Sequence, residues 1–220
     1  MKEPADPVRA RPGTPGPVVL LAFLGGGAVI GVGAKLADGA ATWAGDAATY
    51  LAVWVVAVAL IGAFAPTPVQ AALRSAVAFL GMCAGYYAWT GIVLGYPVGR
   101  EAIVWTALAL SAVPLLAVCV QWARSGDRWW SGIVFAGVAA LCLVDGAIGR
   151  VVIAVTEEVP EAFLASVRPV QAVIEVLGSA VIVLLLPRTW RSRAIALLAV
   201  TPLAFLLGAL LTEARSLIGV

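Results

Sequence analysis

Histidine is absent from this chain of 220 residues, and charged side chains are scarce. Without imidazole, the sequence excludes histidine metal sites, Ser–His nucleophile pairs and histidine ligation of haem. Only 12% of the residues are charged and 62% are hydrophobic, whereas a soluble domain has about 25% charged residues. The formal net charge is only +2 and the basic residues are scattered along the chain, which excludes a basic surface that binds nucleic acid.

Long stretches without any charged residue divide the chain. They are residues 12–34, 47–73, 75–99, 102–123, 129–144, 176–187 and 194–212. A bilayer-spanning helix needs ~20 apolar residues, and no polar stripe typical of a water-facing helix interrupts these runs. We therefore predict an all-α transmembrane bundle of seven helices, with six as the alternative. The predicted helices are at about 18–36, 48–65, 71–94, 102–121, 130–155, 170–186 and 194–213. Pro114 and Pro202 fall inside two of them and predict kinks.

The N-terminal segment and the cysteines carry no predicted site. Residues 1–16 hold four prolines among mixed charges, which predicts a disordered cytoplasmic tail. A single transmembrane helical domain is expected to follow over residues 17–220. Cys83, Cys119 and Cys142 fit no metal-binding spacing, so we interpret them as small buried hydrophobic residues.

The distribution of Lys and Arg between the predicted spans indicates an orientation. Nine of them lie in the N-terminal tail and in the loops that follow the second, fourth and sixth predicted helices. The other five lie at the opposite ends of the predicted helices. The positive-inside rule then predicts a multi-pass protein of the cell membrane with a cytoplasmic N-terminus. Tryptophans near the span ends predict two interfacial belts. The inner belt is Trp122, Trp129, Trp130 and Trp190, and the outer belt is Trp43, Trp89 and Trp105.

Polar residues in or near the spans gather in the predicted outer half. They are Lys35, Asp38, Tyr86, Tyr87, Trp89, Asp145, Arg150 and Glu175. Lys35 and Asp38 are three residues apart on one helix face, so they can pair. Asp145 is predicted about 15 Å deep in helix 130–155, at 1.5 Å per residue. An unpaired carboxylate there costs several kcal/mol, so we expect contact with Lys35, Arg150 or a tyrosine, or protonation.

This polar cluster has two interpretations that the sequence leaves open. In the first, the residues line an outward-facing pocket and bind a small molecule, a proton or a cation. In the second, they form interhelical ion pairs that only fix the packing. Gly27 and Gly31 have the small-residue spacing that lets helices approach closely, either inside the bundle or against a partner.

Three short segments carry a resemblance to a known family. Lys35-Leu36-Ala37-Asp38, Trp54 and Ala84-Gly85-Tyr86-Tyr87 resemble an uncharacterised family of polytopic integral membrane proteins from high-GC Gram-positive bacteria. The resemblance covers about residues 18–100, and the ratio of 12 Arg to 2 Lys suits such a bacterial source. It implies a membrane location and no assigned activity.

We expect a small integral membrane transport or solute-binding protein that takes a small molecule or a cation from the outer side. The alternative is a non-catalytic membrane subunit or assembly partner, or a homo-oligomer, that packs through the glycine-rich first helix. We expect the protein to be surrounded by the lipid bilayer and to have no nucleic-acid partner. We predict no enzyme activity, no cofactor and no metal site, because no nucleophile–base pair or metal-ligand set is recognisable.

Overall fold

The computed structural model describes residues 16–40, 44–45, 50–126, 129–156 and 168–218. Within these ranges the chain is helical and has no β-strand, which confirms the all-α prediction for them. The helices are α1 (Pro17–Asp38), α3 (Leu51–Phe64), α4 (Pro68–Ala88), the π-helix η1 (Trp89–Val93), α5 (Glu101–Leu110), α6 (Ala112–Ser125), α7 (Trp130–Leu141), α8 (Ala147–Thr156), α10 (Pro169–Leu185) and α11 (Trp190–Ile218). Trp43 and most of the predicted tail lie outside the described residues.

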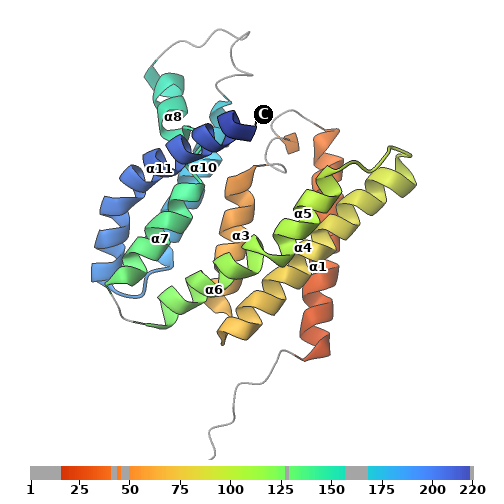
Figure 1. The fold of residues 1–220 in the computed structure, drawn as a ribbon, viewed down its shortest axis with the longest axis horizontal. Helices are drawn as coiled ribbons and strands as arrows, with labels where there is room; N and C mark the ends of the chain where they lie inside the picture. The colour runs from red at the N-terminus through yellow and green to blue at the C-terminus, as the bar shows by residue number, and fades with distance from the viewer. Residues whose placement is uncertain (1–15, 41–43, 46–49, 127–128, 157–167, 219–220) are drawn as a thin grey trace, which may run out of the picture.

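The helices pack lengthwise as a bundle with two sides (Figure 1). α1, α4 and α5 form one side, α7, α10 and α11 form the other, and α3 and α6 lie between them. α1 packs on α4, α11 packs on α7, and α3 contacts both α6 and α10. Phe135 and Ile182 are fully buried in the central core among alanines such as Ala136 and Ala139. Small side chains of this kind let helices approach closely.

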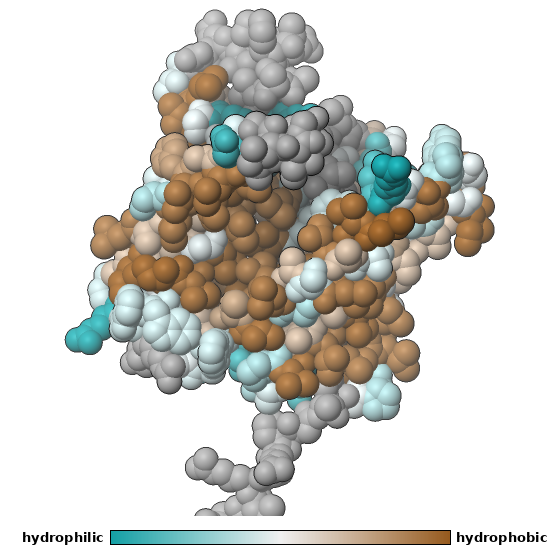
Figure 2. Space-filling view, in the orientation of Figure 1, coloured by the Kyte–Doolittle hydropathy of each residue, from teal (hydrophilic) through white to brown (hydrophobic). Residues whose placement is uncertain are grey.

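Four helical stretches are long and apolar enough to cross a bilayer, by length and composition. They are Pro17–Asp38, Pro68–Val93, Glu101–Ser125 and Trp190–Glu213. Large hydrophobic side chains such as Val29, Ile103 and Leu198 are exposed along them. Apolar residues cover much of the face seen in Figure 2. A water-soluble monomer rarely exposes contiguous apolar surface on this scale, so the fold indicates a membrane protein.

The predicted kink at Pro114 is present as a break between α5 and α6. α5 ends at Leu110, and Ser111 has φ −122° and ψ −77°, outside the helical region. Proline has no amide hydrogen and its ring clashes with the carbonyl group four residues earlier, which is that of Leu110. The Ser111 hydroxyl donates to the Ala107 carbonyl oxygen at 2.6 Å. The proline therefore bends this span and does not end it.

The prediction of one uninterrupted helix over residues 130–155 is wrong. α7 ends at Leu141 and α8 begins at Ala147. Gly146 has φ +78°, and its amide donates to the Leu143 carbonyl oxygen at 3.1 Å. Glycine adopts this left-handed conformation without steric cost and commonly ends helices. The Asp145-Gly146 dipeptide was the turn signal in the sequence, and the prediction extended the helix past it although the charge-free run ends at Val144.

Candidate functional site

The crossing of α1 and α4 is the closest helix packing around the candidate site. A Cβ atom added to Gly27 or Gly31 of α1 would overlap the carbonyl oxygen of Ala78 or Met82 in α4. Glycines of α4 face α1 in the same way, because a Cβ at Gly85 would overlap the Ala28 carbonyl oxygen. The spacing of Gly27 and Gly31 is therefore used inside the chain, against α4.

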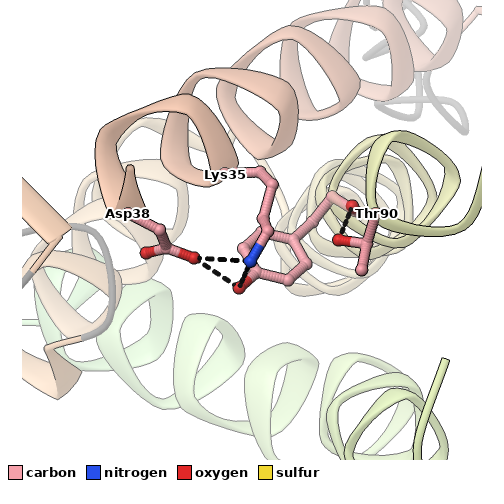
Figure 3. A network of polar contacts seen from close by, with 4 residues as sticks. Lys35, Asp38 and Thr90 are labelled. Atoms are coloured by element: carbon pink, nitrogen blue, oxygen red, sulfur yellow. Dashed lines mark hydrogen bonds and ion pairs between the residues drawn. The ribbon is translucent and has the colours of Figure 1, made fainter. Parts of the chain in front are cut away.

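This close packing brings the end of α1 onto the end of α4, where three polar side chains meet. Lys35 Nζ donates to Asp38 Oδ2 at 3.1 Å, which confirms that these two residues pair. The Tyr86 hydroxyl donates to the same carboxylate oxygen at 2.6 Å and accepts from Lys35 Nζ at 3.3 Å. Lys35 and Asp38 extend from one helix toward the segment that carries Thr90 (Figure 3). The Asp38 carboxylate neutralises the Lys35 ammonium group, and each of the three side chains is hydrogen-bonded to the other two.

A short π-helix continues α4 beside this network. The buried Thr90 hydroxyl in η1 donates to the Tyr86 carbonyl oxygen at 2.8 Å (Figure 3). Tyr86 and Tyr87 pack edge to face, with ring centroids 5.2 Å apart. π-Helical turns are rare and are frequently found at functional sites. Here the wider turn follows directly after the two tyrosines.

Next to this network lies a cavity of about 240 Å³, which we call the aromatic cavity. It is lined by Trp54 of α3, Tyr86 and Tyr87 of α4, and Glu101 and Trp105 of α5, together with Ala34, Met82 and Cys83. A second cavity of about 370 Å³, the apolar cavity, shares Trp54, Met82, Cys83 and Trp105 with it. The other residues that line the apolar cavity carry hydrocarbon or thiol side chains. The two cavities thus adjoin, and among the described residues that line them only those of the aromatic cavity include hydroxyl and carboxylate groups.

A separate polar network joins α8 to α10. Arg150 Nη2 lies 2.5 Å from Glu175 Oε2, and Arg150 Nη1 donates to Gln171 Oε1 at 2.9 Å. Gln171 Nε2 donates to the other Glu175 oxygen at 2.7 Å. Glu175 is only 2% exposed. These three side chains hydrogen-bond with one another, while Arg150 Nε has no partner among the described residues, and none of the three lines the two cavities.

The structure therefore does not bring the predicted site residues together in one place. Lys35, Asp38, Tyr86 and Tyr87 lie together at the α1–α4 crossing. Arg150 and Glu175 lie on the other side of the bundle, on helices that pack against each other. Trp89 belongs to η1 and is not among the residues that line either cavity.

Asp145 is the largest departure from the predicted site. It lies in the connection between α7 and α8, and its side chain is exposed. Among the described residues, Lys35 pairs with Asp38 and Arg150 with Glu175, and Asp145 makes no direct ion pair with either cation. The predicted position of Asp145 inside a helix is wrong, because the structure breaks that helix.

Sequence reasoning missed the residues that line the aromatic cavity opposite the tyrosines. Trp54 and Trp105 lie in apolar runs, and the sequence gives no indication that their rings face the same space. Glu101 did give a signal, because it is an acidic residue at the edge of an apolar run. Gln171 was also missed, since an uncharged amide does not stand out in such a run. Among the described residues, no three His, Cys, Asp or Glu side chains gather to hold a metal ion.

Comparison with known proteins gives a family but no activity. Residues 10–216 match a family model described as a family of unknown function, DUF6518. No curated protein and no solved structure matches the chain. The match agrees with the predicted membership of an uncharacterised family and extends well beyond residues 18–100. Function must therefore be argued from the chemistry of the site.

Proposed function

The chain belongs to DUF6518, and from its site we propose that it binds a small organic cation in the aromatic cavity, as a membrane transport or solute-binding protein. The observation that carries the proposal is the wall of that cavity, which holds four aromatic side chains and one carboxylate. The faces of aromatic rings attract cations by about 0.5–2 kcal/mol each. The Glu101 carboxylate adds a negative charge.

The neighbouring basic residues do not oppose a bound cation. Lys35 is held by Asp38 at 3.1 Å, and its ammonium group lies 5.0 Å from the centre of the Tyr86 ring. Its charge is therefore compensated by a carboxylate and an aromatic face. Arg100 is adjacent to Glu101 in the chain but is not among the residues that line the cavity. Among the described residues that line the wall, Glu101 is the only charged one.

The apolar cavity narrows the ligand class further. It shares two tryptophans with the aromatic cavity and extends between α3, α4, α5 and α6. A ligand whose charged group lies against Tyr86, Tyr87 and Glu101 can extend a hydrocarbon substituent into this second space. Each buried methylene would contribute ~0.8 kcal/mol. An alkylammonium compound fits both cavities.

A series of quaternary ammonium ions tests this proposal by thermal unfolding of the purified full chain in neutral detergent. We expect hexyltrimethylammonium to stabilise at lower concentration than choline, and at a hundred times its Kd to add ~2.7 kcal/mol. The neutral isostere of choline, 3,3-dimethylbutanol, should have no such effect. Glu101→Gln should weaken binding about tenfold, which is ~1.4 kcal/mol.

Asp145→Asn is the matched control, because it removes an exposed carboxylate outside the cavity. It should bind the ammonium series as the unmodified chain does. Equal stabilisation by 3,3-dimethylbutanol would show that charge has no part in binding. Loss of binding in Asp145→Asn, with Glu101→Gln unaffected, would move the site to the α7–α8 connection.

The same proposal includes seven passes through the cell membrane with a cytoplasmic N-terminus. Its supports are the alternating direction of successive helices in Figure 1 and the nine-to-five distribution of Lys and Arg. The shorter helices α3, α7 and α10 then span together with the four long ones. This orientation would open the aromatic cavity to the outer side.

Cysteine labelling tests this orientation. In a cysteine-free background, an impermeant thiol reagent applied to intact cells should label Gly99→Cys and should not label Ser125→Cys. Gly99 precedes α5 and Ser125 ends α6, so the two positions mark opposite ends of one helical span. Both should react after the cells are lysed. The reverse pattern in intact cells would place the aromatic cavity on the cytoplasmic side.

The alternative function, a membrane subunit that packs through the first helix, has less support. Gly27 and Gly31 are the glycines whose spacing favoured it, and their face is covered by α4. Gly25, Gly26 and Gly33 have open space around them, but they do not form that spacing on a single face. The arginine-rich composition also keeps a high-GC Gram-positive bacterial source as a prediction.

A further inference from the structure

Two cavities are lined by residues where α3 and α6 end and α11 begins. This end of the bundle lies opposite the C-terminal end of α1 (Figure 1). The two cavities measure about 370 Å³ and 190 Å³, and both are lined by Arg124, Ser125 and Arg188. We call the two together the arginine pocket. Its wall combines residues from the α3–α4 connection, the end of α6 and the α10–α11 connection.

Arg124 is fixed in place and still has free hydrogen-bond donors. Its Nη1 donates to the Leu186 carbonyl oxygen at 3.0 Å, and its guanidinium group lies 5.0 Å from the centre of the Phe64 ring. A guanidinium has five N–H donors, so most of them remain for another acceptor. Arg188 is exposed and lines the same two cavities.

Gln121 gives an independent sign that this pocket accommodates a polar ligand. Its side chain is only 6% exposed and lines the larger cavity. Its Oε1 atom has no hydrogen-bond partner among the described residues. Buried amides are almost always hydrogen-bonded, and the two ends of an amide group can exchange places by a flip. Gln121 can therefore present an N–H donor to a ligand in the cavity.

The charge at this end of the molecule is not balanced by the described residues. The described ion pairs are Lys35–Asp38 and Arg150–Glu175, so no described carboxylate neutralises Arg124 or Arg188. The described residues in 65–74, 121–126, 129–131 and 186–193 together include five arginines and no acidic residue. The pocket thus lies in a region of strong positive charge.

We infer that the arginine pocket binds a phosphate group. Two guanidinium groups match the several acceptor oxygens of a phosphate, and charge-assisted bonds of this kind are about twice as strong as neutral ones. The Gln121 amide of the larger cavity and the Ser192 hydroxyl of the smaller cavity supply further donors, whereas the Thr189 hydroxyl already donates to Ser192 Oγ. The apolar wall formed by Phe64 and Pro66 would contact the part of the ligand that carries the phosphate.

This phosphate can belong to a phospholipid headgroup or to a soluble phosphate ester. Trp122, Trp129 and Trp190 are exposed around the same end, as expected of an interfacial belt at headgroup depth. A basic pocket between helices at that depth is typical of sites for anionic lipid headgroups. The experiment therefore needs one arm for each source.

Binding is measured with delipidated full chain in neutral detergent, by native mass spectrometry and by thermal unfolding. The probes are dioctanoylphosphatidylglycerol, dioctanoylglycerol without phosphate, and glycerol 3-phosphate. We expect the phospholipid to bind and dioctanoylglycerol not to bind. Arg188→Gln should weaken phospholipid binding at least tenfold. Arg191→Gln is the matched control, since Arg191 is exposed in the first turn of α11 but lines neither cavity, and its binding should stay within twofold.

The outcomes distinguish a phospholipid from a soluble phosphate ester, and they distinguish both from non-specific binding to surface charge. Competition by glycerol 3-phosphate at similar concentration would assign the pocket to a soluble phosphate ester, and its failure would assign it to a lipid. An equal loss of phospholipid binding in Arg188→Gln and Arg191→Gln would show that binding depends on surface charge alone, which would overturn the proposed pocket. Failure of both phosphate probes to bind would overturn the inference outright. Gln121→Leu, which leaves every arginine in place, should also weaken binding. Unchanged binding would show that the buried Gln121 amide does not contact the phosphate.

Discussion

Replacing Gly31 by valine is expected to lower the apparent free energy of unfolding by about 3 kcal/mol, the upper end of the usual cost of overpacking. A Cβ atom at this position would overlap the Met82 carbonyl oxygen, and a backbone atom in a helix cannot move aside as a side chain can. α1 and α4 would have to separate. The measurement is unfolding in detergent by heat or by SDS, followed by circular dichroism.

Gly33→Val is the matched control for this prediction. Gly33 lies on the same helix, and a Cβ there has nothing within 4 Å. Its effect should stay within ~0.5 kcal/mol, as for other surface substitutions. Separation of α1 from α4 should also break the contact between Tyr86 and Asp38, so Gly31→Val should weaken binding of the ammonium series in any fraction that remains folded. Equal stability of the two variants would show that the α1–α4 crossing is not the tight interface described above.

The positions of the helices were predictable because a bilayer imposes a simple rule on the sequence. The predicted helices 18–36, 170–186 and 194–213 match α1, α10 and α11 to within about five residues at each end. The exact ends depend on local features, such as the prolines that begin α1 and α4. The prediction failed at Asp145-Gly146, because it extended the helix beyond the charge-free run that ends at Val144, and Gly146 turns the chain there.

The candidate site was only partly predictable for a different reason. The Lys35–Asp38 pair follows from helix periodicity alone and was found. The contact of Asp38 with Tyr86 depends on the register between α1 and α4, which the glycines of both helices determine. Gly81 and Gly85 repeat the spacing of Gly27 and Gly31. This shared spacing indicates that the two helices pack together, but it is recognised only when the two segments are compared with each other. The partner of Glu175 depended on the break before α8, and so it was missed together with the break.

Glu175→Gln is expected to destabilise the protein by about 3–5 kcal/mol, the cost of leaving one member of a buried ion pair without its partner. The substitution keeps the shape of the side chain and its hydrogen bond with Gln171. It removes the charge that compensates Arg150, whose side chain is 16% exposed. The measurement is again unfolding in detergent, compared with the unmodified chain.

A double variant distinguishes the loss of charge compensation from the loss of a well-packed side chain. Glu175→Gln combined with Arg150→Gln removes both charges and leaves amides that can hydrogen-bond with Gln171, so it should recover at least half of the lost stability. Asp145→Asn should change stability by less than ~0.5 kcal/mol, because that carboxylate is exposed and outside the network. If Asp145→Asn proved as costly as Glu175→Gln, the α7–α8 connection would have to be buried in the membrane. If Glu175→Gln were neutral, the α8–α10 network would be a hydrated surface contact, and α8 would be free to separate from α10.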